Sequence, residues 1–234
     1  MKNRNGFTLA EVLITLGIIG VVAAMTLPAL LTSTQAAQFR TQFKKTLAVA
    51  SQAVVVNLAM SDFDAGTTTS TDIAKGADGE PLASLGNIFS NRLQVLNKNG
   101  IATAAELWSI TDGSTSGGVG GISKKVDNRI STANYTFFLN DNSVISFPKS
   151  CSANTAASPC KGIIDVNGKK KPNKIAQCDT MIAKIGMSPE GNKTNMKVCS
   201  KVSKAYDVIP IKIYDQKVEP NSEAGRYLLY QAGK

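Results

Sequence analysis

The sequence predicts an α+β fold: a long N-terminal helix, membrane-spanning in its first half, packs on an antiparallel β-sheet and is followed by a disulfide-tied C-terminal region. Three observations support this prediction. Residues 7–31 form an almost unbroken apolar run with one charge, Glu11. Apolar side chains recur at helical spacing over residues 39–58. All four cysteines fall in the C-terminal third, which is rich in loop-forming residues.

The apolar run is long enough to cross a membrane. Its 25 residues would extend about 37 Å as a helix, against a hydrocarbon core of about 30 Å. Lys2 and Arg4 precede it, so the positive-inside rule places the N-terminus in the cytoplasm and exports the rest. A secretory signal peptide, cleaved near Ala23-Ala24-Met25, and a plain signal anchor are the alternatives. Neither alternative explains Glu11.

Glu11 is a carboxylate inside an apolar helix, where a charge is tolerated when it has a partner. If the chain were cut after Gly6, the new amino group of Phe7 would lie one helical turn away. In an assembly, the Glu11 of one subunit could instead neutralise the Phe7 amine of its neighbour. Such a pair would fix the axial register of stacked helices, because an unpaired charge in apolar surroundings is penalised far more than a pair.

The run Gly6-Phe7-Thr8-Leu9-Ala10-Glu11-Val12-Leu13-Ile14 resembles the class III leader of type IV pilins and of the pseudopilins of type II secretion. The resemblance implies cleavage between Gly6 and Phe7 by a prepilin peptidase and N-methylation of Phe7. It implies that Glu11, fifth in the mature chain, docks subunits into a filament. Gly20 and Pro28 stand where helices of this family melt or kink in filaments, and both residues weaken helices.

The resemblance also implies a pilin-like fold and a set of partners. These are other pilin or pseudopilin subunits in a homo- or hetero-filament, the prepilin peptidase, a polytopic platform protein and an assembly ATPase. The expected segments are a leader (1–6), a membrane or filament-core half-helix (7–31), an amphipathic continuation (32–61) and an exported domain (62–234). The protein is expected to wait in the cytoplasmic membrane as a single-pass protein, then to enter a periplasmic or cell-surface filament.

The cysteines of an exported domain predict disulfides. Three connectivities are possible, and we favour Cys151–Cys160 with Cys178–Cys199. A four-cysteine zinc site is the alternative, but its ligands usually come in pairs about two to four residues apart. The gaps here are 8, 17 and 20 residues, which disfavours zinc.

Several elements are predicted along the chain. The N-terminal helix should run from about residue 7 to 60, with an apolar stripe formed by Phe39, Phe43, Leu47, Ala50, Val54 and Leu58. A second helix is expected around Pro81–Asn97, and Gly113–Gly121 is expected to be a surface loop. A hairpin should join Tyr135–Leu139 to Ser143–Phe147 through the turn Asn140-Asp141-Asn142. Gly162–Val166 is a further strand, with weaker strand candidates at Ile209–Tyr214 and Arg226–Gln231.

One stretch has the composition of a cation site. Asp165, Asn167 and Asp179 offer oxygen ligands that could hold Ca²⁺, and the segment resembles one common near the ends of pilin-like proteins. A hydrogen-bonded Asx turn is the simpler interpretation. The adjacent lysines Lys169, Lys170, Lys171 and Lys174 could bind DNA phosphates. They could equally form a solvated face, because aromatic platforms for single strands are absent from the neighbouring sequence.

The sequence offers little for catalysis. It contains no histidine, which excludes Ser-His-Asp and Cys-His mechanisms and His-ligated metals. We therefore expect a non-enzyme without an obligatory cofactor: a pilin, minor pilin or pseudopilin that is a structural subunit of a type IV pilus or type II secretion filament. The alternatives are a minor pilin whose basic tip binds DNA or a surface ligand, and a plain membrane-anchored exported protein.

Overall fold

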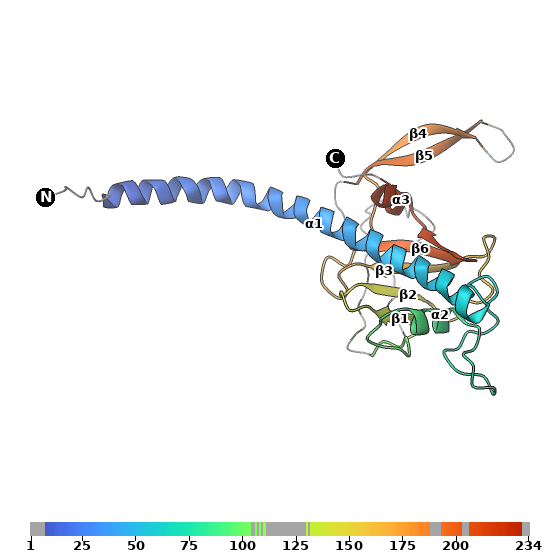
Figure 1. Ribbon diagram of the computed structural model, residues 1–234. Helices are drawn as coiled ribbons and strands as arrows, with labels where there is room; N and C mark the ends of the chain where they lie inside the picture. Colours follow the sequence, from blue (N-terminus) through green and yellow to red (C-terminus); the bar gives the residue numbers. More distant parts are fainter. Residues whose placement is uncertain are drawn as a thin grey trace.

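The N-terminal helix α1 dominates the shape of the protein. The computed structural model describes residues 8–103, 106, 108, 110, 130, 132–187, 193–202 and 206–230. The leader with Gly6 and Phe7, and the predicted loop Gly113–Gly121, lie outside these residues. Helix α1 runs over Leu9–Ser61, 53 residues, or about 80 Å. Figure 1 shows its first half projecting from the molecule and its second half lying across the globular domain.

Helix α1 is continuous, as the sequence predicts. Gly20 and Pro28 both lie inside it without interrupting it, so their expected melting stays a prediction for the assembled filament. The helix ends where Asp62 adopts a left-handed conformation with φ of 55°. That backbone turn directs the chain away from the helix axis and into the domain.

Five antiparallel strands form the main sheet, in the order β1-β2-β3-β6-β7. Their bounds are Asn134–Phe138 for β1, Val144–Pro148 for β2, Cys160–Asp165 for β3, Val208–Tyr214 for β6 and Lys217–Pro220 for β7. The predicted hairpin is β1–β2, and the predicted strands near residues 162 and 209 are β3 and β6. The sequence did not predict β7.

The second half of α1 packs on one face of this sheet. Phe43, Leu47 and Ala50 from the predicted stripe are buried in one cluster with Ile164 and Ile211 of the sheet. A smaller cluster lies on the other face, where Val144, Ile163 and Val208 pack with Ile110 and Ile130. Alternate residues of β3 and β6 therefore enter different clusters, as expected for strands buried on both faces.

The remaining described elements differ from the predictions at several points. Helix α2 covers only Leu85–Arg92, shorter than the predicted Pro81–Asn97, because Ser84 caps its N-terminus by accepting a hydrogen bond from the Asn87 backbone. Strands β4 (Thr180–Met187) and β5 (Lys193–Lys201) form a separate two-stranded sheet that was not predicted. Figure 1 shows this hairpin standing apart from the main sheet.

The prediction of a strand at Arg226–Gln231 is wrong. Helix α3 occupies Glu223–Tyr230. Ser222 begins it, since its hydroxyl accepts a hydrogen bond from the Gly225 N–H. The buried side chains of Ala224 and Leu228 lie four residues apart, so they share one face of the helix.

The favoured disulfide connectivity is confirmed. Cys151 is bonded to Cys160 and Cys178 to Cys199, with Cα–Cα distances of 5.5 and 5.6 Å. The zinc alternative is wrong, because every one of its four sulfurs is held in a disulfide. The first bridge joins the segment before β3 to Cys160, the first residue of that strand. The second joins Cys178, just before β4, to Cys199 in β5, and so closes the base of the β4–β5 hairpin.

The contact between α1 and the sheet should dominate stability. Phe43 is completely buried, so Phe43→Ala should lower the free energy of unfolding by about 3–5 kcal/mol. Val55→Ala is the matched control on the same helix, because Val55 is 49% exposed and its truncation should change stability by about 0.5 kcal/mol or less. Urea denaturation of the full chain in detergent, followed by fluorescence of the single tryptophan, measures both. Equal effects of the two substitutions would contradict the packing described here.

Candidate functional site

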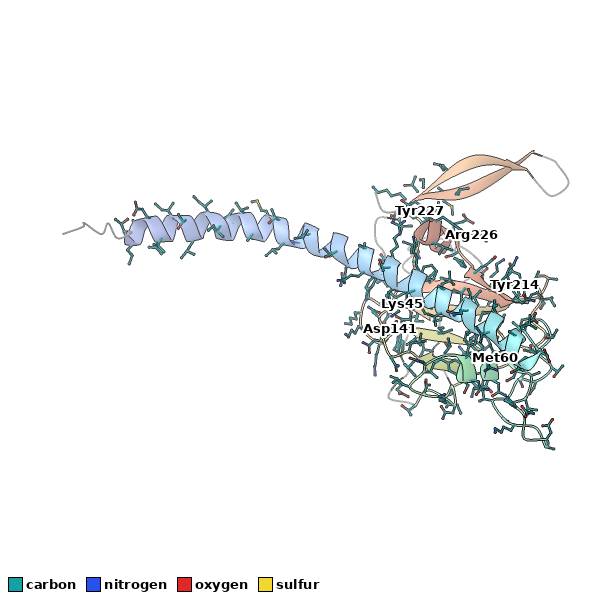
Figure 2. All side chains as sticks on the ribbon, viewed as in Figure 1. Lys45, Met60, Asp141, Tyr214, Arg226 and Tyr227 are labelled. Atoms are coloured by element: carbon teal, nitrogen blue, oxygen red, sulfur yellow. A yellow bond between two sulfur atoms is a disulfide. The ribbon has the colours of Figure 1, made fainter. Side chains whose placement is uncertain are left out.

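The projecting half of α1 is an apolar surface without a partner in the single chain. A segment of 20 residues, Leu9–Pro28, has a mean hydropathy of 2.2 and none of it is buried. Leu13 is 61% exposed and Ile19 is 63% exposed, and Figure 2 shows side chains projecting above and below this half of the helix. By length and composition the segment can cross a membrane. A surface this apolar requires lipid or other helices around it.

The first turn of α1 holds Glu11 in a capping box. The Glu11 carboxylate accepts hydrogen bonds from the Thr8 backbone N–H and the Thr8 hydroxyl, both at 2.8 Å. The Glu11 N–H in turn donates to the Thr8 hydroxyl at 3.3 Å. Sequence reasoning singled out Glu11 but missed Thr8, although a threonine three residues before a glutamate is a recognised helix-start signal. Glu11 therefore lies at the N-terminal end of the apolar helix, and its hydrogen bonds to Thr8 hold its side chain in one rotamer.

A second candidate site is the segment 166–174, called the lysine loop below. Asp165, the last residue of β3, accepts hydrogen bonds through Oδ1 from the Asn167 N–H at 3.2 Å and the Gly168 N–H at 3.0 Å. This is the Asx turn that the sequence analysis gave as the simpler interpretation. Oδ2 of Asp165 accepts a bond from the indole N–H of Trp108 at 3.2 Å.

Asp207 holds the other end of the lysine loop. Its carboxylate accepts hydrogen bonds from the Asn173 N–H at 2.8 Å and the Lys174 N–H at 2.9 Å. Asp165 and Asp207 come together because Asp165 pairs in register with Val208, the first residue of β6. Sequence reasoning missed Asp207 and Trp108, since only the strand register places them beside Asp165.

The two carboxylates form a buried acidic pair. Neither aspartate is exposed to solvent. Burial, followed by the nearby charge of Asp207, raises the pKa of Asp165 to about 8. Burial also raises the pKa of Asp207, against the hydrogen bonds from Lys174 and Asn173. At neutral pH the pair therefore holds a proton, as like charges in a buried site require.

The three predicted calcium ligands lie in different settings. Asp165 is buried and occupied by hydrogen bonds, while Asp179 is exposed beside the base of the β4–β5 hairpin, where its N–H donates to the Lys201 carbonyl. Within the described part of the chain, no three His, Cys, Asp or Glu side chains are grouped closely enough to hold a metal. Calcium binding stays a prediction that the geometry of Asp165 does not favour.

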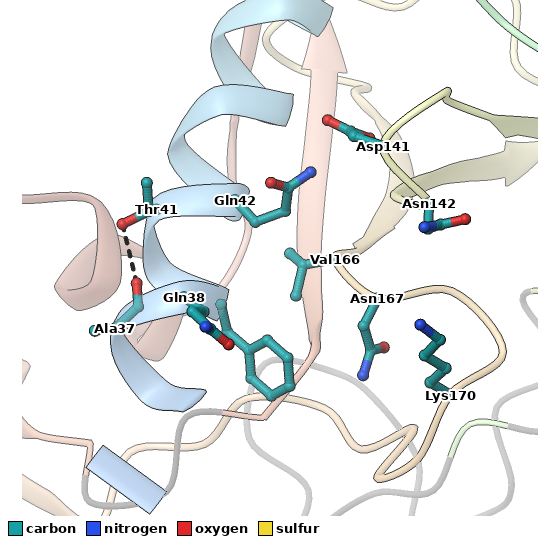
Figure 3. A pocket seen from close by; sticks show the side chains of 10 residues that line it. Ala37, Gln38, Thr41, Gln42, Asp141, Asn142, Val166, Asn167 and Lys170 are labelled. Atoms are coloured by element: carbon teal, nitrogen blue, oxygen red, sulfur yellow. Dashed lines mark hydrogen bonds between the residues drawn. The ribbon is translucent and has the colours of Figure 1, made fainter. Parts of the chain in front are cut away.

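The lysine loop lies at the end of the domain from which the projecting half of α1 emerges. A groove of about 570 Å³ is lined on one side by α1 residues, among them Ala37 and Gln42, and on the other by Asn142, Asn167 and Lys170 (Figure 3). Helix α1 continues to Ser61 beyond this level. The expectation that the lysines form a tip, at the far end of the domain, is therefore wrong. They lie at the neck of the molecule, where the projecting half of α1 enters the domain.

The exposure of the lysines differs along the loop. Lys169, Lys170 and Lys171 are exposed. Lys174 is half-buried, and its ammonium lies 5.6 Å from the centre of the Tyr206 ring, a distance typical of a cation–π contact. Asn167 Nδ2 donates to the Lys171 carbonyl at 3.3 Å, so the loop is folded on itself and presents its lysines from a fixed backbone.

The acidic pair should give an unusual pH dependence. The folded-state pKa of Asp165, about 8, lies above the unfolded value of about 3.9. The folded state thus binds a proton that the unfolded state has lost, and stability should fall as pH rises from about 5 to about 8. No histidine titrates in this window. Asp165→Asn should flatten the profile when unfolding is measured by urea titration at several pH values.

Asp141→Asn is the control for this measurement. The hydrogen bonds from Ser143 and from Lys45 outweigh burial and lower the pKa of Asp141 to about 2, so its titration ends well below pH 5. Asp141→Asn should shift the whole profile without changing its slope between pH 5 and 8. A flat profile in the unmodified protein would mean that Asp165 is ionised in the folded state.

Comparison with known proteins identifies the N-terminal segment. Residues 1–27 match the family model described as the prokaryotic N-terminal methylation motif. Neither the curated proteins nor the solved structures gave a match. The motif covers the leader, the Thr8–Glu11 capping box and most of the exposed apolar segment. The chain therefore carries the class III prepilin-type leader of type IV pilins and pseudopilins.

Proposed function

We propose that the protein is a structural subunit of a type IV filament system, either a pilin, a minor pilin or a pseudopilin of type II secretion. One observation carries the proposal: a prepilin-type methylation motif at residues 1–27 leads directly into a membrane-length helix whose apolar surface is uncovered in the single chain. A membrane-anchored precursor and a helix-packed filament both cover that surface. A single soluble chain does not.

Processing is the first step of the proposed function. Lys2 and Arg4 keep the N-terminus in the cytoplasm, and the prepilin peptidase cuts between Gly6 and Phe7 and methylates Phe7. Cleavage removes both basic residues of the leader. It leaves a new amino group within about one helical turn of Glu11.

Docking through Glu11 is the second step. The capping box holds the Glu11 carboxylate at the very start of the helix, where it faces apolar surroundings once the helix is packed among others. A carboxylate there is stabilised by a cation, and the Phe7 amine of a neighbouring subunit supplies one. The pairing fixes how far one helix slides along the next. An assembly ATPase and a platform protein would supply the work of extraction from the membrane.

The structural role needs no catalytic group of this chain. The proposed interactions are apolar packing and one ion pair, and the leader motif supports a subunit of an assembly more than an enzyme. A plain membrane-anchored protein is the remaining alternative. It differs in one measurable respect, because it would keep its first six residues.

Substitution of Glu11 tests docking. Glu11→Ala should leave membrane insertion intact and abolish incorporation into filaments, because it removes the charge that pairs with the neighbouring amine. Glu11→Gln is the informative companion: glutamine also completes a capping box with a preceding threonine, so it keeps the helix start and loses only the charge. Incorporation is measured by the amount of subunit in sheared or cross-linked filaments relative to the membrane fraction.

The two variants separate charge from capping. If Glu11→Gln assembles normally while Glu11→Ala does not, Glu11 acts through the cap and the proposed ion pair is wrong. If both variants assemble normally, Glu11 has no part in docking. Thr8→Val, which removes the hydroxyl of the cap, should weaken assembly less than either substitution of Glu11.

The processed N-terminus is directly observable. Mass spectrometry of the N-terminal peptide from native cells should find a chain that begins at N-methylated Phe7. Its presence in the sheared surface fraction indicates a pilus component, and its confinement to membranes indicates a pseudopilin or an unassembled pool. An intact Met1 in every fraction would overturn the proposed function.

A further inference from the structure

The lysine loop lies close to where the membrane would end. If the apolar half of α1 leaves the hydrocarbon near Leu31, Ala37 lies about 9 Å further along the helix. Ala37 and Lys170 line the same groove, so the loop is at this level. The headgroup layer extends roughly 5–8 Å beyond the hydrocarbon, and a lysine side chain reaches about 6 Å from its backbone. The ammonium groups can therefore enter the headgroup layer.

The lysine loop itself carries charge of one sign. Residues 166–174 contain four lysines and no acidic residue. Two acidic side chains line the adjoining cavities. Asp141 forms an ion pair with Lys45 at 2.9 Å. The Glu106 carboxylate accepts two hydrogen bonds from Thr103, and its one negative charge is outnumbered by the four lysines.

Hydrogen bonds at both ends of the lysine loop order its backbone before any ligand binds. Asp165 fixes its beginning through two hydrogen bonds and Asp207 fixes its end through two more. Lys170 and Lys171 lie between these anchors and are exposed. An ordered loop loses little backbone entropy when its side chains bind, which favours association.

An aromatic side chain lies at the same end of the domain. The Nε of Arg40 donates to the Leu228 carbonyl at 3.1 Å, which places the C-terminal turn of α3 beside the neck of α1. Tyr230 in that turn is 77% exposed. Tyrosines with one apolar and one polar end are enriched at the boundary between membrane and water.

We propose that the lysine loop is a docking surface for anionic lipid headgroups, which holds the globular domain down on the membrane before the subunit enters a filament. The proposal goes beyond the filament role and rests only on the membrane anchor, so it holds for any single-pass state of the chain. Lys170 and Lys171 supply the attraction, and Tyr230 supplies an interfacial contact at the same end of the domain.

The position of the loop favours lipid over nucleic acid. A surface that captures DNA outside the cell has to face away from the membrane, and the lysine loop faces the projecting half of α1. Bases also stack on exposed aromatic rings in single-strand binding sites, but among the described residues the two rings that contact the loop or its anchors are engaged. Trp108 donates its indole N–H to the buried Asp165, and the Tyr206 ring contacts the Lys174 ammonium. Lipid headgroups require only charge and proximity.

Energy transfer from Trp108 tests the docking. Trp108 is the single tryptophan of the chain and lines a cavity together with Lys169 and Lys170. The full chain is placed in vesicles that carry a dansyl acceptor on the headgroups, of phosphatidylcholine alone or with one third phosphatidylglycerol. Transfer should be higher in the anionic vesicles at low salt. It should fall towards the neutral level as salt shortens the Debye length from about 10 Å to about 3 Å.

The double variant Lys170→Gln/Lys171→Gln gives the specific result. Each lysine near an anionic surface shifts the docked-to-undocked ratio about fivefold, so the pair should lower it about 25-fold. The matched control is Lys161→Gln/Lys217→Gln, which removes the same charge from exposed positions at the other end of β3 and at the start of β7. The control should leave transfer unchanged.

Two outcomes would overturn the proposal. One is equal transfer in neutral and anionic vesicles, which needs no variant and is unaffected by any folding defect. The other is an equal loss in both double variants, which would mean that net charge and not the lysine loop decides. Failure of filament assembly or leader processing would leave these measurements unaffected, since the vesicles contain no assembly machinery.

Discussion

The packing of the second half of α1 on the five-stranded sheet is the contact on which the rest of the structure depends. One continuous helix serves two surroundings. Its first half exposes apolar side chains in every direction, and its second half buries a single stripe that includes Phe43 and Leu47. Because the helix is not interrupted between them, the orientation of the domain relative to the membrane or filament axis is set by this one interface. The lysine loop and the C-terminal turn of α3 acquire their positions from it.

Periodicity gave the parts of the fold that depend on local pattern. The stripe from Phe39 to Leu58 predicted the helix and its buried face. The turn Asn140-Asp141-Asn142, in which Asn142 has a positive φ of 67°, predicted the β1–β2 hairpin. The helix α3 was mistaken for a strand because Tyr227, Leu228, Leu229 and Tyr230 form a short apolar run that fits either structure. Its capping contact with Ser222 decided the outcome. Strands β4 and β5 were missed because neither contains an aromatic residue and both contain few β-branched residues, so their strand signal is weak.

The candidate sites also divide into those visible as a local sequence pattern and those that depend on the fold. The leader and Glu11 are contiguous in sequence, so their pattern is visible without a structure, and Thr8 was overlooked only because its capping signal was not used. The buried acidic pair could not be predicted, because Asp165 and Asp207 are 42 positions apart and meet only through the register of β3 and β6. The four lysines were visible as a run, but their place at the neck depends on where the loop returns to α1.

The β4–β5 hairpin stands outside the main sheet, and the Cys178–Cys199 bridge closes its base over a separation of 21 residues. A two-stranded sheet is marginal on its own in water, and a covalent closure restricts its unfolded alternatives. The hairpin thus keeps its shape without contributing strands to the core. Its sequence can therefore change through evolution with little effect on the folding of the main sheet, which makes the hairpin a natural place for this chain to diversify the surface that it displays.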